Sequence, residues 1–259
     1  MTISFEPKSI TKLLVRGLKD RNRNVVLERF GLGASANRKT LEAIGANYGI
    51  TRERVRQIEN CALNAIRKDA AFKEARGAFS ELAKIISRKG WVVSEENIFN
   101  SLADDARTKN HLHFLFVLGD DFIKMKEDEE FYHRWALNEE TCEMVHEVLN
   151  RMHQRVKEDD LIPENEIIAE FKKQAYAVMR RRVNEEMVRS WLNVSKVLGR
   201  NATDQWGRAR SANIRPRGMR DLAFLVLRKH GSPMHFSEVA DAISKFFARE
   251  AHLATVHNE

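Results

Sequence analysis

The sequence contains little cysteine, proline or glycine, and these shortages exclude several kinds of protein. Its 2 cysteines, Cys61 and Cys142, are too few for a disulfide framework, and neither belongs to a Cys-x-x-Cys pair. We interpret both as reduced thiols of a protein inside the cell. With only 4 proline and 12 glycine residues in 259, a long disordered tract is not expected.

The chain also lacks the features that mark a membrane protein or a common enzyme. No window approaches the roughly 18 consecutive apolar residues that a membrane span needs. The start Met1–Pro7 has no signal-peptide pattern. No phosphate-binding loop, Gly-x-Ser-x-Gly elbow or dinucleotide fingerprint is present. We therefore expect a cytoplasmic protein with no membrane contact, no catalytic activity and no cofactor.

The charge of the chain favours a polyanionic partner. Lys and Arg number 44 against 37 Asp and Glu, which gives a net charge of +7. Because acidic residues are also numerous, the positive charge has to be localised to be useful. The composition, 43% hydrophobic and 31% charged, is ordinary for a globular chain, and 259 residues suffice for one large domain or several small ones.

The segment Thr51–Glu59 carries side chains that are suited to reading DNA bases. Arg pairs bidentately with guanine, Gln pairs with adenine, and Glu accepts a hydrogen bond from cytosine. At about 3.6 residues per turn these side chains share one helical face, and apolar residues fall largely on the opposite face. The expected base-reading residues are Arg52, Glu53, Arg56 and Gln57. The expected packing residues are Val55, Ile58, Ala62, Leu63 and Ile66.

A short helix and a tight turn precede this segment. Thr40 is a good N-cap for a helix over 41–48, Gly49 supplies the turn, and Thr51 caps the next helix. This order predicts a helix-turn-helix. The cap at Thr40 also directs backbone N–H groups outward, where a phosphate can sit. The expected phosphate contacts are Arg38, Lys39, Thr40, Thr51 and Arg54. The alternative is a solvated charged helix, because such charge runs are common on surfaces.

Four stretches of this region together resemble region 4 of housekeeping-class bacterial sigma factors. They are Asn24–Leu32, Thr40–Gly45, Thr51–Glu59 and Ala62-Leu63. Two departures stand out: Ala43 occupies a position where the family usually has a second acidic residue, and Cys61 lies near one where a basic residue is common. The second departure is expected to weaken a backbone or activator contact.

This resemblance implies a function in transcription. In the family the second helix reads the −35 promoter element, while the helices before it sit against the β flap of RNA polymerase. The resemblance therefore implies promoter DNA and the polymerase core as partners, and a nucleoid-associated protein of a bacterial or phage-infected cell. It covers about the first quarter of the chain. No part of the sequence resembles the aromatic-rich sigma region that melts the −10 element. We expect no promoter opening by this chain alone.

The pattern after Lys68 stays helical and ends in a predicted β-hairpin. The expected helices are 79–86, 94–102 and 110–118, and the expected hairpin strands are 122–126 and 131–137. Helix, helix, helix and hairpin is the order of a winged helix. A second, less regular unit of this kind begins near Glu139. Its expected helices are 144–152, 163–171 and 185–198, with a wing at 203–214.

A third unit is expected in the last fifth of the chain. Its characteristic residues are Trp206, Ile214–Gly218, Gly231, Met234–Phe236 and Glu238–Ala240. These residues resemble the HARE-HTH winged helix found in the delta subunit of some bacterial RNA polymerases. The segments Arg88–Glu95 and Lys229–Glu238 share a basic residue, a glycine stop and a Ser-Glu helix start, which we interpret as a weak internal repeat. The sequence ends where a third helix should be under way, so we expect an incomplete module.

Other candidate sites are weaker. A possible secondary basic patch would neutralise phosphates, and an exposed helix flank is the equal alternative. This patch consists of Arg180, Arg181, Arg182 and Arg189. His111, His113 and His133 lack metal-ligand spacing, so no metal site is expected. Three acidic stretches lie beside predicted turns and are interpreted as solvated loops rather than paired catalytic carboxylates. They are Asp120-Asp121, Glu127–Glu130 and Asp159-Asp160.

These patterns predict a mainly α protein in which a sigma region 4-like helix-turn-helix is followed by tandem winged-helix modules with small β-hairpin wings. The predicted parts are 1–70, 77–138, 139–213 and 214–259. The predicted function is sequence-specific binding of double-stranded DNA in transcription, in contact with RNA polymerase. One alternative is a polymerase-binding or assembly module whose helices contact protein. Another is the DNA-binding component of a restriction or modification system. The oligomeric state stays open.

Overall fold

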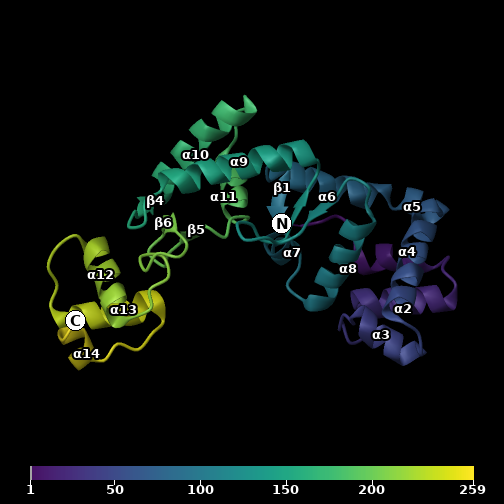
Figure 1. The fold of residues 1–259 in the computed structure, drawn as a ribbon, viewed down its shortest axis with the longest axis horizontal. Helices are drawn as coiled ribbons and strands as arrows, with labels where there is room; N and C mark the ends of the chain where they lie inside the picture. Colours follow the sequence, from purple (N-terminus) through teal and green to yellow (C-terminus); the bar gives the residue numbers. More distant parts are fainter. Residues whose placement is uncertain (1) are drawn as a thin grey trace. The chain divides into compact units, whose positions relative to one another are not determined.

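The computed structural model describes residues 2–259, which divide into two compact units. Unit 1 extends to Lys126 and also includes His133–Thr141, and unit 2 comprises Glu127–Tyr132 and Cys142–Glu259. Each unit is mainly helical and holds one three-stranded antiparallel sheet (Figure 1). The predicted fold class is confirmed: a helix-turn-helix is followed by helical modules with small β-hairpins.

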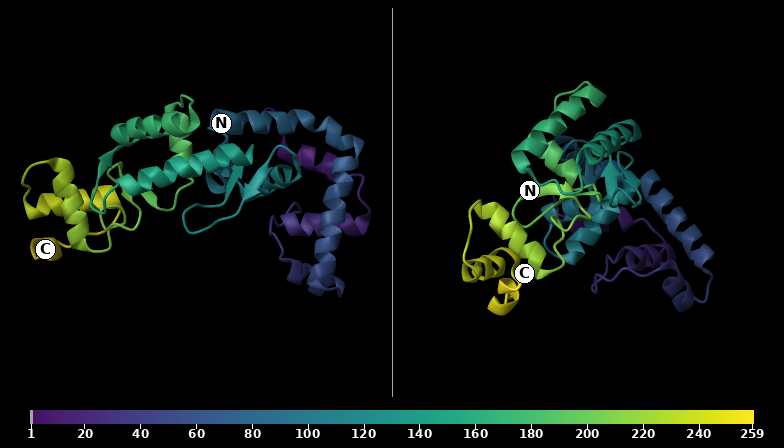
Figure 2. Two further views of the ribbon diagram at one scale, coloured as in Figure 1. Left: turned by 45° about the horizontal axis from the view of Figure 1, so that its top comes forward. Right: turned by 60° about the vertical axis from the view of Figure 1, so that its left-hand side comes forward.

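Unit 1 begins with the helix-turn-helix and continues into the first sheet. Its helices before the sheet are α1 (Pro7–Val15), α2 (Asp20–Phe30), α3 (Leu41–Tyr48), α4 (Arg52–Lys68), α5 (Ala70–Glu74) and α6 (Arg76–Arg88). They are followed by β1 (Val92–Ser94), α7 (Glu95–Leu102), α8 (Ala106–Leu118), β2 (Ile123–Met125) and β3 (Arg134–Ala136). Figure 2 shows α4 lying against α2 and α3 and leading through α5 into α6.

Unit 2 contains the second sheet and the last helices. Its first elements are α9 (Glu139–Arg155), which starts in unit 1, β4 (Ile162–Pro163), α10 (Glu164–Met179), α11 (Glu185–Leu192), β5 (Leu198–Arg200) and β6 (Gln205–Arg208). The last helices are α12 (Met219–His230), α13 (Phe236–Phe247) and α14 (Leu253–His257). No strand occurs among residues 214–259.

The two sheets are built in the same way. Each has the order helix, strand, helix, helix, strand, strand, and the last strand lies in the centre of its sheet. In unit 1 the central Trp135 pairs with Val93 on one side and Lys124 on the other. In unit 2 the central Trp206 pairs with Ile162 and Arg200. The same residue types thus occupy matching places in both sheets, which indicates an internal repeat. The sequence predicted only the hairpins, because β1 and β4 are too short to show a strand pattern.

One predicted helix is shorter than expected. The segment predicted as a helix over 185–198 ends at Leu192, and the predicted wing at 203–214 is a hairpin over 198–208. The reason is the turn at Ser195, whose hydroxyl oxygen accepts N–H groups of Val197 and Leu198. The backbone on either side of this turn also pairs with residues 127–132 of the same unit: Tyr132 N donates to the Val194 oxygen at 2.9 Å, and Lys196 N donates to the Glu130 oxygen at 2.7 Å.

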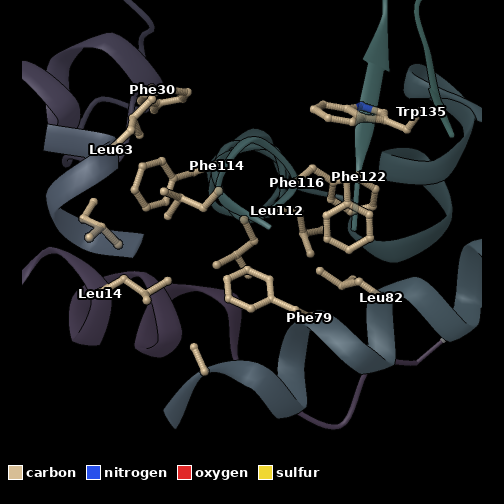
Figure 3. Packing of buried hydrophobic residues seen from close by; sticks show 14 of the residues in the cluster. Leu14, Phe30, Leu63, Phe79, Leu82, Leu112, Phe114, Phe116, Phe122 and Trp135 are labelled. Carbon is tan, nitrogen blue, oxygen red and sulfur yellow. The ribbon is translucent and has the colours of Figure 1, made fainter. Parts of the chain in front are cut away.

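Helix α8 lies at the centre of the core of unit 1 (Figure 3). Phe114 packs edge-on against Phe30 of α2, with ring centroids 5.0 Å apart. Phe116 points the other way, toward Phe122 at 4.7 Å and Trp135 at 5.2 Å. The predicted boundary at 70–77 lies within this cluster, which contains residues from α1, α2 and α4 together with residues from α6, α8 and β3. That boundary stays a prediction.

The last three helices form a small core of their own. Its buried members are Leu222, Val226, Val239, Ala240, Ile243 and Val256. Helices α12 and α13 lie within the predicted third unit, 214–259. Among residues 2–259 no helix is long and apolar enough to cross a membrane.

Candidate nucleic-acid interface

The helix-turn-helix has the local geometry that its sequence predicts. The Thr40 hydroxyl accepts the N–H of Ala43 at 3.2 Å, and the Thr51 hydroxyl accepts the N–H of Arg54 at 3.2 Å. Each side chain therefore satisfies a backbone N–H at the start of its helix. Gly49 ends α3 in the left-handed region, with φ of 63°, as glycine readily does. Both predicted caps and the turn are confirmed.

Close contact between α3 and α4 depends on Gly45. A Cβ atom at this position would lie 2.6 Å from the backbone oxygen of Ile50. No real side chain tolerates that approach to a rigid backbone atom, so residue 45 has to be glycine in this geometry. The turn therefore depends on two glycines. Gly49 adopts the left-handed conformation, and Gly45 leaves room for the backbone of Ile50.

The apolar face of α4 contacts two hydrophobic clusters. Val55 and Ile58, near its start, pack with Val25 and Ile44. Its later apolar residues, Ala62, Leu63 and Ile66, belong to the larger cluster around α8. All the predicted packing residues of this helix are buried. The opposite face is held in a fixed direction as a result.

The predicted base-reading side chains are exposed on that opposite face, and each makes a polar contact with a neighbouring side chain. The Nε and Nη2 groups of Arg56 donate to the two carboxylate oxygens of Glu53 at 2.8 and 2.7 Å. The hydrogen bond from Arg56 lowers the pKa of Glu53 below its usual value. Arg52 pairs with Glu42 of α3 at 3.0 Å, and Gln57 accepts a hydrogen bond from Arg54 at 3.1 Å.

The predicted phosphate contacts have structural partners as well. Lys39 pairs with Glu28 at 2.9 Å, and this hydrogen bond lowers the pKa of that carboxyl group. Arg38 donates through Nε to the Asn110 side chain of α8 at 2.6 Å. Arg54 and the two capping threonines lie at the starts of α3 and α4. Their contacts with phosphate stay predictions, as do the base-reading roles.

Asn110 is a residue that the sequence patterns did not identify. It is buried, and its Nδ2 group donates to the backbone oxygens of Gly31 at 3.0 Å and Ala36 at 2.7 Å. Gly31 accommodates this contact because it has no Cβ and a φ of 62°. One amide thus holds the loop before α3 against α8. No local signal marks such a residue, because its partners lie more than 70 positions away in the sequence.

Arg67 makes a second connection between α4 and α8. Its guanidinium donates to the backbone oxygens of Leu118 at 3.1 Å and Val117 at 2.9 Å. These are carbonyl groups at the end of α8, which the helix itself leaves without partners. Helix α4 is therefore joined to α8 by hydrogen bonds as well as by apolar packing.

The histidines of α8 are buried. Burial lowers the pKa of His113 to about 2, so its ring is neutral near neutral pH. Its Nε2 atom lies 3.2 Å from the Lys124 ammonium group, which itself pairs with Glu95 at 2.7 Å. Among residues 2–259, no group of three His, Cys, Asp or Glu side chains is placed to hold a metal ion. The expected absence of a metal stays a prediction.

The possible secondary basic patch separates into two parts. Arg180, Arg181 and Arg182 lie in the turn after α10 and are exposed. Arg189 lies on α11, where it pairs with Glu164 at 2.6 Å and with Glu185 at 3.5 Å. Its charge is therefore balanced by two carboxylates. The turn and Arg189 do not form one continuous surface of uncompensated charge.

Comparisons with known proteins bear on the helix-turn-helix. Residues 14–68 match the family described as Sigma-70, region 4. Similar relatives are the RNA polymerase sigma factors SigA of Listeria monocytogenes and Listeria innocua, each 46% identical over 59 residues. This match covers 23% of the chain and only 16% of either relative. No solved structure matches. The predicted resemblance to sigma region 4 is confirmed for this segment, and the resemblance to HARE-HTH stays a prediction.

Proposed function

We propose that this protein binds double-stranded DNA in transcription and reads a −35-like promoter element with α4. The observation that carries the proposal is the exposed set Arg52, Glu53, Arg56 and Gln57 on a helix whose other face is buried. This helix lies within residues 14–68, the segment that matches Sigma-70, region 4. The proposed action is binding alone, without catalysis and without a cofactor.

The ion pair between Arg56 and Glu53 supports a reading role for both residues. A guanidinium has five N–H donors, and two of those in Arg56 go to Glu53. The remaining three suffice for a bidentate contact with guanine. Glu53 holds the guanidinium in one orientation, so less side-chain freedom is lost when DNA binds. Gln57 is not oriented for reading in the same way. Its side-chain oxygen accepts a hydrogen bond from Arg54, and this bond has to break before the oxygen can accept one from adenine.

The proposed contact with RNA polymerase is polar. Both relatives are RNA polymerase sigma factors. The resemblance to sigma region 4 implies that the helices before α4 lie against the β flap. In this chain the apolar faces of α1 and α2 pack against the cluster around α8, including Leu14 and Phe30. Their exposed faces carry Lys8, Lys12 and Lys19. We therefore propose a contact between these basic faces and an acidic surface of the polymerase, in place of an apolar one.

The C-terminal helices complete the proposal. We assign α12 to α14 to a module that resembles HARE-HTH, with a role in transcription. We also propose that the chain does not melt promoters, because it carries no segment that resembles the aromatic-rich sigma region for the −10 element. The restriction-linked alternative has no observation in its favour.

Selection of bound sequences from a random duplex pool tests the DNA proposal. The wild-type protein is expected to enrich one short motif, and Arg56→Ala to relax it at a single position. Lys12→Ala, on the exposed face of α1, is the matched control and is expected to enrich the same motif as the wild type. If the wild type enriches no motif but RNA polymerase subunits co-purify with it, the protein-binding alternative replaces this proposal.

A further inference from the structure

The turn between α10 and α11 has an unusual backbone and a high positive charge. It carries Arg180, Arg181 and Arg182 in succession, and all three side chains are exposed. Arg180 ends α10 in the left-handed region, with φ of 51°. Residues other than glycine adopt this conformation rarely and at an energetic cost. The fold therefore maintains a costly bend at the point where it presents three arginines.

Basic residues near this turn are paired with carboxylates, whereas two arginines of the turn itself are not. Lys172 pairs with Glu185 at 3.2 Å, and Arg189 pairs with Glu164 at 2.6 Å. By contrast, Arg180 and Arg182 form no ion pair with any residue in the range 2–259. Two exposed guanidinium groups are thus left for an external anion.

A hollow beside the turn is lined by one of these arginines, Arg182, and by the hydroxyl-bearing side chain of Tyr176. It has a volume of about 460 Å³ and is lined by Lys172, Tyr176, Arg182 and Val183. The Tyr176 side chain is 52% exposed, unusually so for an aromatic residue. Arg, Lys and Tyr are among the side chains that contact phosphate oxygens in protein–DNA complexes. The hollow therefore combines the donors that a DNA backbone requires.

We propose that this turn is a second DNA-binding site, which contacts the phosphate backbone of duplex DNA without reading its sequence. The proposal rests on the proposed function, because it takes the same duplex as its partner. A single strand would need successive aromatic platforms for its bases, and the hollow has one aromatic ring. Acidic side chains begin α11, at Glu185 and Glu186, and they disfavour deeper contact with negatively charged DNA. Backbone contact at the turn fits both features.

The salt dependence of DNA binding tests this proposal. Each neutralised phosphate contributes a slope of about −0.9 to the plot of log K against log salt concentration. The double variant Arg180→Gln/Arg182→Gln is therefore expected to flatten the slope by about 1.8 relative to wild type. The assay is fluorescence anisotropy with a duplex longer than the helix-turn-helix footprint. Arg189→Gln is the matched control, because its charge is balanced within the protein, and it is expected to keep the wild-type slope.

Further variants test whether the change in the salt-dependence slope comes from the lost positive charge. Arg180→Lys/Arg182→Lys is expected to restore most of the slope, since lysine keeps the charge. Tyr176→Phe is expected to weaken binding equally on all duplex sequences. An unchanged slope in the glutamine variant, or an equally flat slope in the lysine variant, would overturn the proposal. So would an effect confined to single-stranded DNA.

Failure of the two proposals can be told apart. If α4 does not read DNA, the wild type shows no sequence preference, yet the slope still differs between wild type and the glutamine variant. If the second site does not exist, the slopes agree while sequence preference persists. Thermal unfolding of each variant is measured beside the binding curves, and a folded lysine variant keeps the comparison valid if the glutamine variant is unstable.

Discussion

Replacing Asn110 tests whether the helix-turn-helix depends on α8 for its stability. The variant Asn110→Ala removes two hydrogen bonds to backbone oxygens of Gly31 and Ala36 and one from Arg38. A typical hydrogen bond contributes about 1 kcal/mol, and loss of one partner leaves buried groups unsatisfied. We therefore expect the free energy of unfolding to fall by about 3 kcal/mol. The small loss of packing at this site adds little to that value.

The measurement is urea unfolding followed by circular dichroism, with the midpoint and slope fitted for each variant. Asn24→Ala is the matched control, because Asn24 is also a helical asparagine of unit 1 but is exposed. It is expected to stay within about 0.5 kcal/mol of the wild type. A change equally small for Asn110→Ala would refute the reasoning, since it would mean that the loop before α3 does not depend on this amide.

Three further outcomes are expected. Arg56→Ala should cost about 1–3 kcal/mol of discrimination for the preferred site and little non-specific affinity, and an equal loss on all sequences would assign Arg56 to phosphate. Burial lowers the pKa of His113 to about 2 in the folded protein, against the usual 6.5 of a histidine. The neutral, buried ring therefore contributes fully to the free energy of unfolding above pH 6.5. Below pH 6.5 the unfolded chain binds a proton that the folded chain does not, so stability falls by up to about 1.4 kcal/mol per pH unit until the pH nears 2. Unfolding of His113→Asn should be less pH-dependent than that of the wild type, and parallel profiles would exclude this histidine as the cause. With core polymerase alone the protein should leave promoter thymines unreactive to permanganate, and reactive thymines would contradict the absence of melting.

The division of unit 1 can be tested with fragments. A fragment ending near residue 75 lacks α8 and leaves the cluster residues Leu14, Phe30 and Leu63 without that cover. We expect it to unfold at lower denaturant concentration than a fragment that ends at residue 141. Equal stability of the two fragments would support the predicted boundary near residue 70 as a true domain boundary.

Local features of the helix-turn-helix could be predicted from the sequence because their causes lie within a few residues. Thr40 and Thr51 accept N–H groups three positions away, and Gly49 adopts its conformation through its own backbone freedom. The alternation of exposed and buried residues along α4 follows from helical geometry alone. These properties require no knowledge of the rest of the chain.

The central place of α8 could not be predicted in this way. The sequence indicated a helix near 110–118. It did not indicate that Phe114 would pack against Phe30 of α2 while Phe116 packs against Trp135 of β3. Its partners, such as Phe30, are distant in the chain, and periodicity does not name them. The strand β1 was missed for a similar reason, because its three residues become a strand only by pairing with β3.

The shared plan of the two sheets has a consequence for how many surfaces the chain can offer to DNA. The winged-helix prediction expects the third helix of each unit to enter a groove of DNA, and these third helices are α8 and α11. Helix α8 is enclosed by the core of unit 1, whereas the outer residues of α11, such as Glu185 and Arg189, face solvent. In unit 1 the third helix therefore supports the helix-turn-helix from inside the core and is not available as a surface. For the proposed DNA binding, the burial of each third helix therefore decides whether that helix can lie at a DNA-binding surface at all.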